Sequence, residues 1–165
     1  KAEGRTQAQK SSTKPQTHEA AAMKIKHPYA VPARLSPDLT RIQAYWEGLL
    51  RGTATMPFWD DVKPTDFPDI VGHAFLIDVL GPPERYRFDQ VGEALASEGL
   101  AGKFLDETPS HRPFEFLRSQ CAATVECATP TYFRDDGAAL PYGRLLLPLW
   151  GEGRISMLLG AVDAA

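Results

Sequence analysis

Apolar residues recur at helical spacing in the first third of the chain. Over residues 36–51 they stand three or four positions apart and form one stripe of a helix: Leu39, Ile42, Trp46, Leu49 and Leu50. Ser36 precedes this stripe as an N-cap residue, and Pro37 and Asp38 suit the first turn that follows it. We therefore predict an amphipathic helix over residues 36–51, with Gly52 as its stop.

Alternating and continuous apolar segments further along the chain predict five strands. Residues 85–91 place Tyr86 and Phe88 on one face, and they pair with residues 73–80 as a hairpin across a Gly-Pro-Pro-Glu turn. Three more strands are predicted at 130–135, 142–150 and 154–162. Turns that contain glycine separate these three strands, at 135–137 and at 151–153.

The segment between the two groups of strands predicts helices. A short helix covers residues 92–99, and a longer one covers residues 112–126. The stripe of the longer helix consists of Phe114, Leu117, Cys121 and Val125. Hairpins at both ends with helices between them predict the α+β class, with a five-stranded antiparallel sheet and the central helices on one face.

The last two predicted strands are apolar on both faces. Residues 145–147 are all leucine, and residues 155–159 hold four apolar side chains. A strand without a polar face is covered on both sides. The central helices provide one cover. The other cover is either the N-terminal helix or a second copy of the chain, and we favour the helix, with dimerisation sharing the surface. The interface candidates are Leu39, Ile42, Trp46 and Leu49.

Charge divides the chain, whose net charge is −3, into two unlike parts. Residues 1–34 carry seven Lys or Arg and two acidic residues, whereas the remainder carries eleven bases and nineteen acids. We expect residues 1–34 to form a flexible basic tail, because they hold almost no large apolar side chain. Residues 35–165 are expected to form one acidic domain that does not bind nucleic acid.

Two further features concern the cellular compartment. The apolar runs are shorter than the roughly 20 residues that a membrane span needs, and no secretory signal pattern opens the sequence. The two cysteines, Cys121 and Cys127, fall on different sides of one predicted helix, so no mutual disulfide is expected. These features indicate a cytoplasmic protein with reduced thiols.

Four segments share their order and spacing with a known family. They are residues 45–52 followed by Pro57, residues 63–68, residues 75–79 leading to 86–92, and residues 145–150 followed by Gly153. Together these segments resemble the PAS domain superfamily, most closely the short stand-alone PAS-like proteins of alpha-proteobacteria. The resemblance spans about residues 36–162. One departure is that Phe58 and Trp59 follow Pro57, where the family usually has an arginine.

The resemblance implies a sensory or protein-interaction role rather than catalysis. A ligand, where one is bound, would lie between the sheet and the central helices. Such pockets are mostly apolar with a few polar groups. The candidate lining residues are Phe75, Tyr86, Phe88, Phe104, Phe114, Arg118, Phe133, Tyr142 and Arg144. The alternative interpretation of the same residues is a filled core.

The sequence shows no motif for catalysis or for a cofactor. Its four histidines do not have the spacing of a metal site: His18, His27, His73 and His111. Cys121 lacks the neighbours of the flavin-binding cysteine of LOV domains. Asp135 and Asp136 precede Gly137 and suit a turn. We therefore predict that the chain is not an enzyme and holds no cofactor, with haem and flavin disfavoured.

The functional hypothesis from the sequence is a stand-alone bacterial signalling module without an output domain of its own. It would form a homodimer, bind a signalling protein and accept a small apolar ligand. The alternatives are a structural adaptor or dimerisation domain with a filled core, and an enzyme on an NTF2-like or START-like fold. The inward positions of the strands are mainly apolar, which disfavours the enzyme. Whether the space between the sheet and the helices is open or filled with side chains distinguishes the first two hypotheses.

Overall fold

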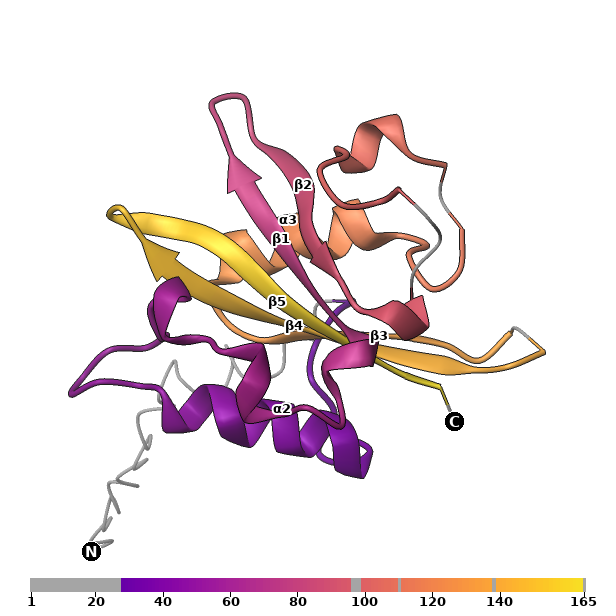
Figure 1. Cartoon of the computed structure of the whole chain (residues 1–165), viewed down its shortest axis with the longest axis horizontal. Coiled ribbons are helices and arrows are strands. Elements are labelled where there is room, and N and C mark those ends of the chain that lie inside the picture. Colours follow the sequence, from indigo (N-terminus) through magenta and orange to yellow (C-terminus); the bar gives the residue numbers. More distant parts are fainter. Residues whose placement is uncertain (1–27, 96–98, 110, 138, 165) are drawn as a thin grey trace, which may run out of the picture.

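A computed structural model describes residues 28–95, 99–109, 111–137 and 139–164 (Figure 1). Most of the predicted basic tail, residues 1–27, lies outside this range. Within it the chain forms two α-helices, five strands and several single turns of 3-10 helix. This is the α+β class that the sequence predicts. In the described part of the chain, neither helix has both the length and the apolar character needed to cross a bilayer.

The five strands form one antiparallel sheet in the order β2-β1-β5-β4-β3. Every strand begins and ends within two residues of its predicted bounds: β1 Ala74–Leu80, β2 Arg85–Val91, β3 Thr131–Asp135, β4 Tyr142–Gly151 and β5 Arg154–Ala164. Both predicted hairpins, β1–β2 and β4–β5, are confirmed. At the tip of the second hairpin, Glu152 and Gly153 have φ angles of 54° and 75°. Two left-handed residues in succession are what a two-residue hairpin turn requires.

The helix α2, Pro37–Gly48, covers β4 and β5 on one face of the sheet (Figure 1). The Ser36 hydroxyl accepts a hydrogen bond from the Leu39 amide at 3.4 Å, which confirms the predicted cap. Leu39, Ile42 and Trp46 are buried, and the Trp46 indole N–H donates to the Pro148 carbonyl oxygen at 2.9 Å. The helix ends at Gly48, three residues before the predicted end.

The helix α3, Leu117–Cys127, covers the opposite face of the sheet. Arg144 and Thr131 contact α3, and because side chains alternate along a strand, Leu145 and Leu147 point to the α2 side. All four of these side chains are buried. The prediction that the closing strands are covered on both faces is therefore confirmed, with a helix of the same chain on each side.

The predicted helices between β2 and β3 are partly wrong. The short helix expected over 92–99 is one 3-10 turn at Glu93–Leu95, and residues 96–98 lie outside the described range. The longer helix begins at Leu117 rather than at 112. Phe116 has a φ angle of 58°, in the left-handed region, so a right-handed helix cannot pass through it. The predicted stripe residue Phe114 therefore lies in a turn before the helix.

A long segment between α2 and β1 joins α2 on the same face of the sheet. It contains three single 3-10 turns, at Trp59–Asp61, Pro64–Asp66 and Val71–His73. Its prolines, Pro57, Pro64 and Pro68, are typical of a loop, but Phe67 and Ile70 are buried in the core. The segment is also tied to α2, because Arg41 and Asp69 form an ion pair at 2.5 Å. It therefore forms a wall beside β1.

Both edges of the sheet are covered by other parts of the chain. At the β2 edge, the Phe88 amide donates to the Lys103 carbonyl at 2.9 Å, and the Gly102 amide donates to the Phe88 carbonyl at 2.6 Å. At the β3 edge, the Tyr132 amide donates to the Tyr29 carbonyl at 2.9 Å. Covered edges oppose strand addition by another chain. The remaining accessible region of the sheet is therefore the face of β1 and β2 on the α2 side.

Candidate functional site

Side chains fill the space between the sheet and α3, where the sequence predicts a ligand. Phe75, Phe88 and Phe114 are buried and pack edge to face, with ring centroids 5.1 to 6.3 Å apart. Such pairs add stability beyond the area that they bury. These three predicted pocket residues thus contact one another, which agrees with the filled-core alternative.

A buried arginine also lies between the sheet and α3. The Arg144 side chain is 0% exposed. Its Nε donates to Gln120 Oε1 at 2.7 Å, and its two terminal nitrogens donate to the carbonyls of Pro113 and Glu115 at 2.7 and 2.9 Å. The guanidinium lies over the Phe133 ring, 4.7 Å from its centroid. Burial lowers the pKa of Arg144 from its ordinary value. The network fixes the segment before α3 to the sheet.

The remaining predicted pocket residues are dispersed. The Tyr142 hydroxyl donates to Glu115 at 2.5 Å, and the Tyr86 hydroxyl donates to Glu84. Burial is the main cause that raises the pKa of both phenols above their ordinary value. Phe104 lies at the β2 edge beneath the Arg85 guanidinium, 3.7 Å away, and Arg118 is exposed. These residues do not form one site.

The stripe of interface candidates is used within the chain. Leu39, Ile42 and Trp46 are buried against the chain's own sheet, and Leu49 is half-buried at the end of α2. A contact with a second copy through the three buried residues would require α2 to leave the sheet. The homodimer itself stays a prediction.

A first hollow, of about 350 Å³, lies at the start of α3. Its apolar walls include Phe88, Phe114 and Leu117, and Arg118 and His111 also line it. Three of the nine predicted pocket residues therefore meet here: Phe88, Phe114 and Arg118. The volume suits a small ligand.

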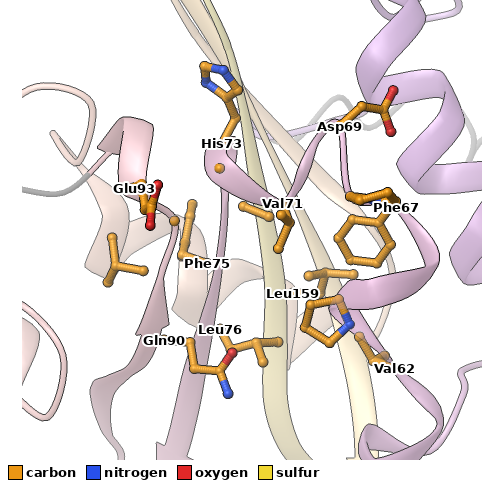
Figure 2. A pocket seen from close by; sticks show the side chains of 16 residues that line it. Val62, Phe67, Asp69, Val71, His73, Phe75, Leu76, Gln90, Glu93 and Leu159 are labelled. Atoms are coloured by element: carbon orange, nitrogen blue, oxygen red, sulfur yellow. The ribbon is translucent and has the colours of Figure 1, made fainter.

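A larger hollow, of about 530 Å³, lies on the other face of the sheet, between β1 and the segment that precedes it. Figure 2 shows Val62, Phe67 and Asp69 on one side of it, and Gln90 and Glu93 on the other. Leu76 and Leu159, which are neighbours across β1 and β5, line the space between. At its end Gly92 touches the Gly72 carbonyl so closely that a Cβ there has no room.

Another hollow, of about 540 Å³, continues the 530 Å³ hollow along the same face of the sheet. The two share Val62, Pro64, Leu76 and Gln90. The second adds Met157 and the ion pair of Asp78 with Arg87, whose atoms are 2.9 Å apart. We call the two hollows together the outer trough. Its floor follows β1, one wall is the 59–73 segment, and the other side follows β2.

Three exposed aromatic side chains lie near the tip of the β4–β5 hairpin, and of these Trp59 lines the outer trough, whereas Trp150 lines a separate hollow together with Val125 of α3. Phe58, Trp59 and Trp150 are 42%, 48% and 37% exposed. Trp150 lies beside the 57–58 segment, because its amide donates to the Pro57 carbonyl at 2.8 Å. Trp59 lies against Gly151, where a Cβ would collide with the indole ring. Exposed clusters of large aromatic side chains mark contact surfaces.

The outer trough carries more unpaired negative than positive charge. Four lining carboxylates have no ion-pair partner among the described residues: Asp60, Asp89, Glu93 and Glu152. Partial burial and then the neighbouring Asp78 carboxylate raise the pKa of Asp89 above its ordinary value. The free trough therefore carries an excess of negative charge, because these four carboxylates face one guanidinium without an ion pair, that of Arg154, among the described Lys and Arg residues that line it.

Sequence reasoning missed the outer trough almost entirely. Phe75 alone is shared between its lining and the predicted pocket residues. The signal for the trough lies in the proline-rich segment between α2 and β1. Its residues Val62, Phe67 and Ile70 are apolar side chains that a solvated loop does not need. Phe58 and Trp59, the departure from the PAS pattern, were a second signal.

Across residues 28–95, 99–109, 111–137 and 139–164, no three His, Cys, Asp or Glu side chains are grouped as metal ligands would be. Comparison with protein-family models, with curated proteins and with solved structures finds no match to this chain.

Proposed function

We propose that this chain is a PAS-like interaction module of signal transduction that holds a segment of another protein in the outer trough. The four sequence segments and the five-stranded antiparallel sheet support the PAS-like part of the proposal. The filled space between the sheet and α3 favours contact with a protein over a ligand enclosed there.

One observation carries the proposal, which is the contrast between the two faces of β1 and β2. On the α3 side, Phe75 and Phe88 are buried in the aromatic cluster. On the α2 side, α2 covers β4 and β5 and leaves two adjoining hollows over β1 and β2. An open trough lined by half-buried Leu76 and Val62 and by exposed Trp59 suits a docked segment.

Site-directed photo-crosslinking tests this function. A benzoylphenylalanine at Gln90, an exposed lining residue, should form a covalent adduct with another protein in the native host. The same group at Glu126, an exposed residue on α3, is the matched control. An adduct from position 90 alone supports the trough as the contact surface. No adduct at position 90, or equal adducts at both positions, contradicts it.

The hollow at the start of α3 favours a second function, the sensing of a small apolar molecule. Its 350 Å³ lies beside Phe88 and Phe114, on the side of the sheet where PAS domains hold ligands. Native mass spectrometry of protein purified without additives would detect such a molecule. Leu105→Trp narrows the hollow and should abolish the added mass, whereas the same substitution at exposed Leu140 should retain it.

A further inference from the structure

The floor of the outer trough fits an extended segment of several residues. β1 has seven residues, and at about 3.3 Å per residue its length is roughly 23 Å. Leu76 and Val62, which are half-buried, give both hollows of the trough partly exposed apolar positions. A partner that presents apolar side chains on one face would remove these positions from water.

The charged side chains along the two sides of the outer trough, which we call its rims, indicate the charge of the partner. Asp60, Asp89, Glu93 and Glu152 are the unpaired carboxylates, and Arg87 is neutralised by Asp78. Arg154 also lines the trough, but it donates to the carbonyl oxygens of Val79 and Ile155, at 2.6 and 3.3 Å. A partner with positive side chains would pair with the rim carboxylates.

The exposed Trp59 ring, at one end of the trough, offers a second kind of contact to a cation. Within the chain, the Arg51 guanidinium already lies over the Phe58 ring, 5.8 Å from its centroid. The next residue, Trp59, is 48% exposed and lines the trough. An indole is the strongest aromatic partner for an ammonium or guanidinium group. A lysine or arginine of the partner would therefore find both a carboxylate and an aromatic face at this end.

We propose that the partner held in the outer trough is a cationic, amphipathic segment of another protein. Its apolar side chains lie near Leu76 and Val62, and its lysines or arginines pair with the rim carboxylates and the exposed Trp59 ring. This inference rests on the proposed function and names the chemistry of its partner. Nucleic acid and anionic membrane carry the same sign of charge as the rims and are disfavoured.

Synthetic peptides test the inference with the full-length chain. Three nine-residue peptides are titrated by fluorescence anisotropy: alternating Lys and Val, alternating Glu and Val, and alternating Lys and Ser. We expect the Lys–Val peptide to bind most tightly, and its affinity to fall as salt is raised. The Glu–Val peptide should not bind, and the Lys–Ser peptide should bind weakly. Equal binding of the Lys–Val and Lys–Ser peptides, or binding of the Glu–Val peptide, overturns the inference.

Two double variants of equal net charge locate the binding. Asp89→Asn with Glu93→Gln removes two rim charges and should weaken Lys–Val binding about fivefold, at about 0.5 kcal/mol for each exposed pair. Glu47→Gln with Glu126→Gln removes two exposed charges elsewhere and should leave the affinity unchanged. All four residues are exposed, so both variants are expected to fold. An equal loss in both variants would indicate general attraction to an acidic protein and overturn the inference.

Photo-crosslinking distinguishes this inference from the proposed function. If the adduct from position 90 maps to a segment rich in Lys or Arg with interleaved apolar residues, both proposals are supported. If it maps to a neutral or acidic segment, the trough is a protein contact surface but the inference fails. If no adduct forms at position 90, the proposed function fails, and the peptide titrations then decide the charge preference alone.

Discussion

At the scale of single residues, the buried Arg144 guanidinium donates three hydrogen bonds. Within the described chain its guanidinium meets no carboxylate and is balanced by two carbonyls, Gln120 and the Phe133 ring. Arg144→Met keeps much of the volume but leaves these acceptors unpaired. We expect the free energy of unfolding to fall by about 2–4 kcal/mol, measured by urea denaturation.

Arg134→Met is the matched control for that substitution. Arg134 is partly exposed on β3 and pairs with Asp136 at 2.5 Å. Partly exposed ion pairs contribute little, so this variant should stay within about 0.5 kcal/mol of the original chain. If the two variants lost equal stability, the buried network of Arg144 would not be the cause of the larger effect.

The two cysteines should differ sharply in reactivity. Cys121 is fully buried, and burial raises the pKa of its thiol to about 12, so almost no thiolate is present at neutral pH. Cys127 is exposed at the end of α3. We expect Ellman's reagent to modify one thiol in the folded protein and two in urea. Cys127→Ser should abolish the native reaction, and a persistent signal would show that Cys121 is accessible.

At the scale of elements, α2 is part of the core rather than an appendage. Ile42 is 0% exposed and faces the sheet. Ile42→Ala should lower the free energy of unfolding by about 2–5 kcal/mol, because it leaves a cavity between helix and sheet. Glu47→Ala, on the exposed side of the same helix, should change it by less than about 0.5 kcal/mol.

Protein concentration provides a further check on α2. If the helix stays on its own sheet, the urea midpoint of the Ile42→Ala variant should not change with concentration. If α2 exchanges between two copies of the chain, both the original chain and the variant become more stable as concentration rises. The second result would return Leu39, Ile42 and Trp46 to an intermolecular interface.

The elements that could be predicted from the sequence are those fixed by local pattern. Alternation and glycine-containing turns predict all five strands. For β4 and β5 the signal is especially local, because the turn at Glu152 and Gly153 that joins them has one favoured geometry. The start of α3 could not be predicted in this way. Phe116 adopts a left-handed φ angle, and Arg144 holds the carbonyls of Pro113 and Glu115 from a distant strand. Tertiary contacts set that boundary.

At the scale of the whole molecule, three predicted pocket residues, Phe75, Phe88 and Phe114, pack against one another, and Phe88 and Phe114 also line the hollow at the start of α3. Phe75, Phe88 and Phe114 are apolar enough for either a pocket or a core, and the sequence contains nothing that separates the two. Their packing depends on which side chains oppose them after folding. The outer trough likewise arises because α2 covers β4 and β5 only, which is a property of the assembled layers.

The affinity of the outer trough for the Lys–Val peptide should depend on pH because of the Asp89 carboxyl. Asp78 and Arg87 face this carboxyl, and the other charged groups of the same hollow are Asp60, Glu152 and Arg154. Its pKa is raised in the free protein, whereas a bound cation favours the ionised form and lowers that pKa. Binding of the Lys–Val peptide should therefore be strongest above the free pKa and weaken as pH falls through it. Asp89→Asn should reduce this pH dependence of binding without abolishing binding at neutral pH.

Carboxyl NMR titration should show the Asp89 pKa falling when peptide is added, and an unchanged or higher pKa would place the peptide away from this rim.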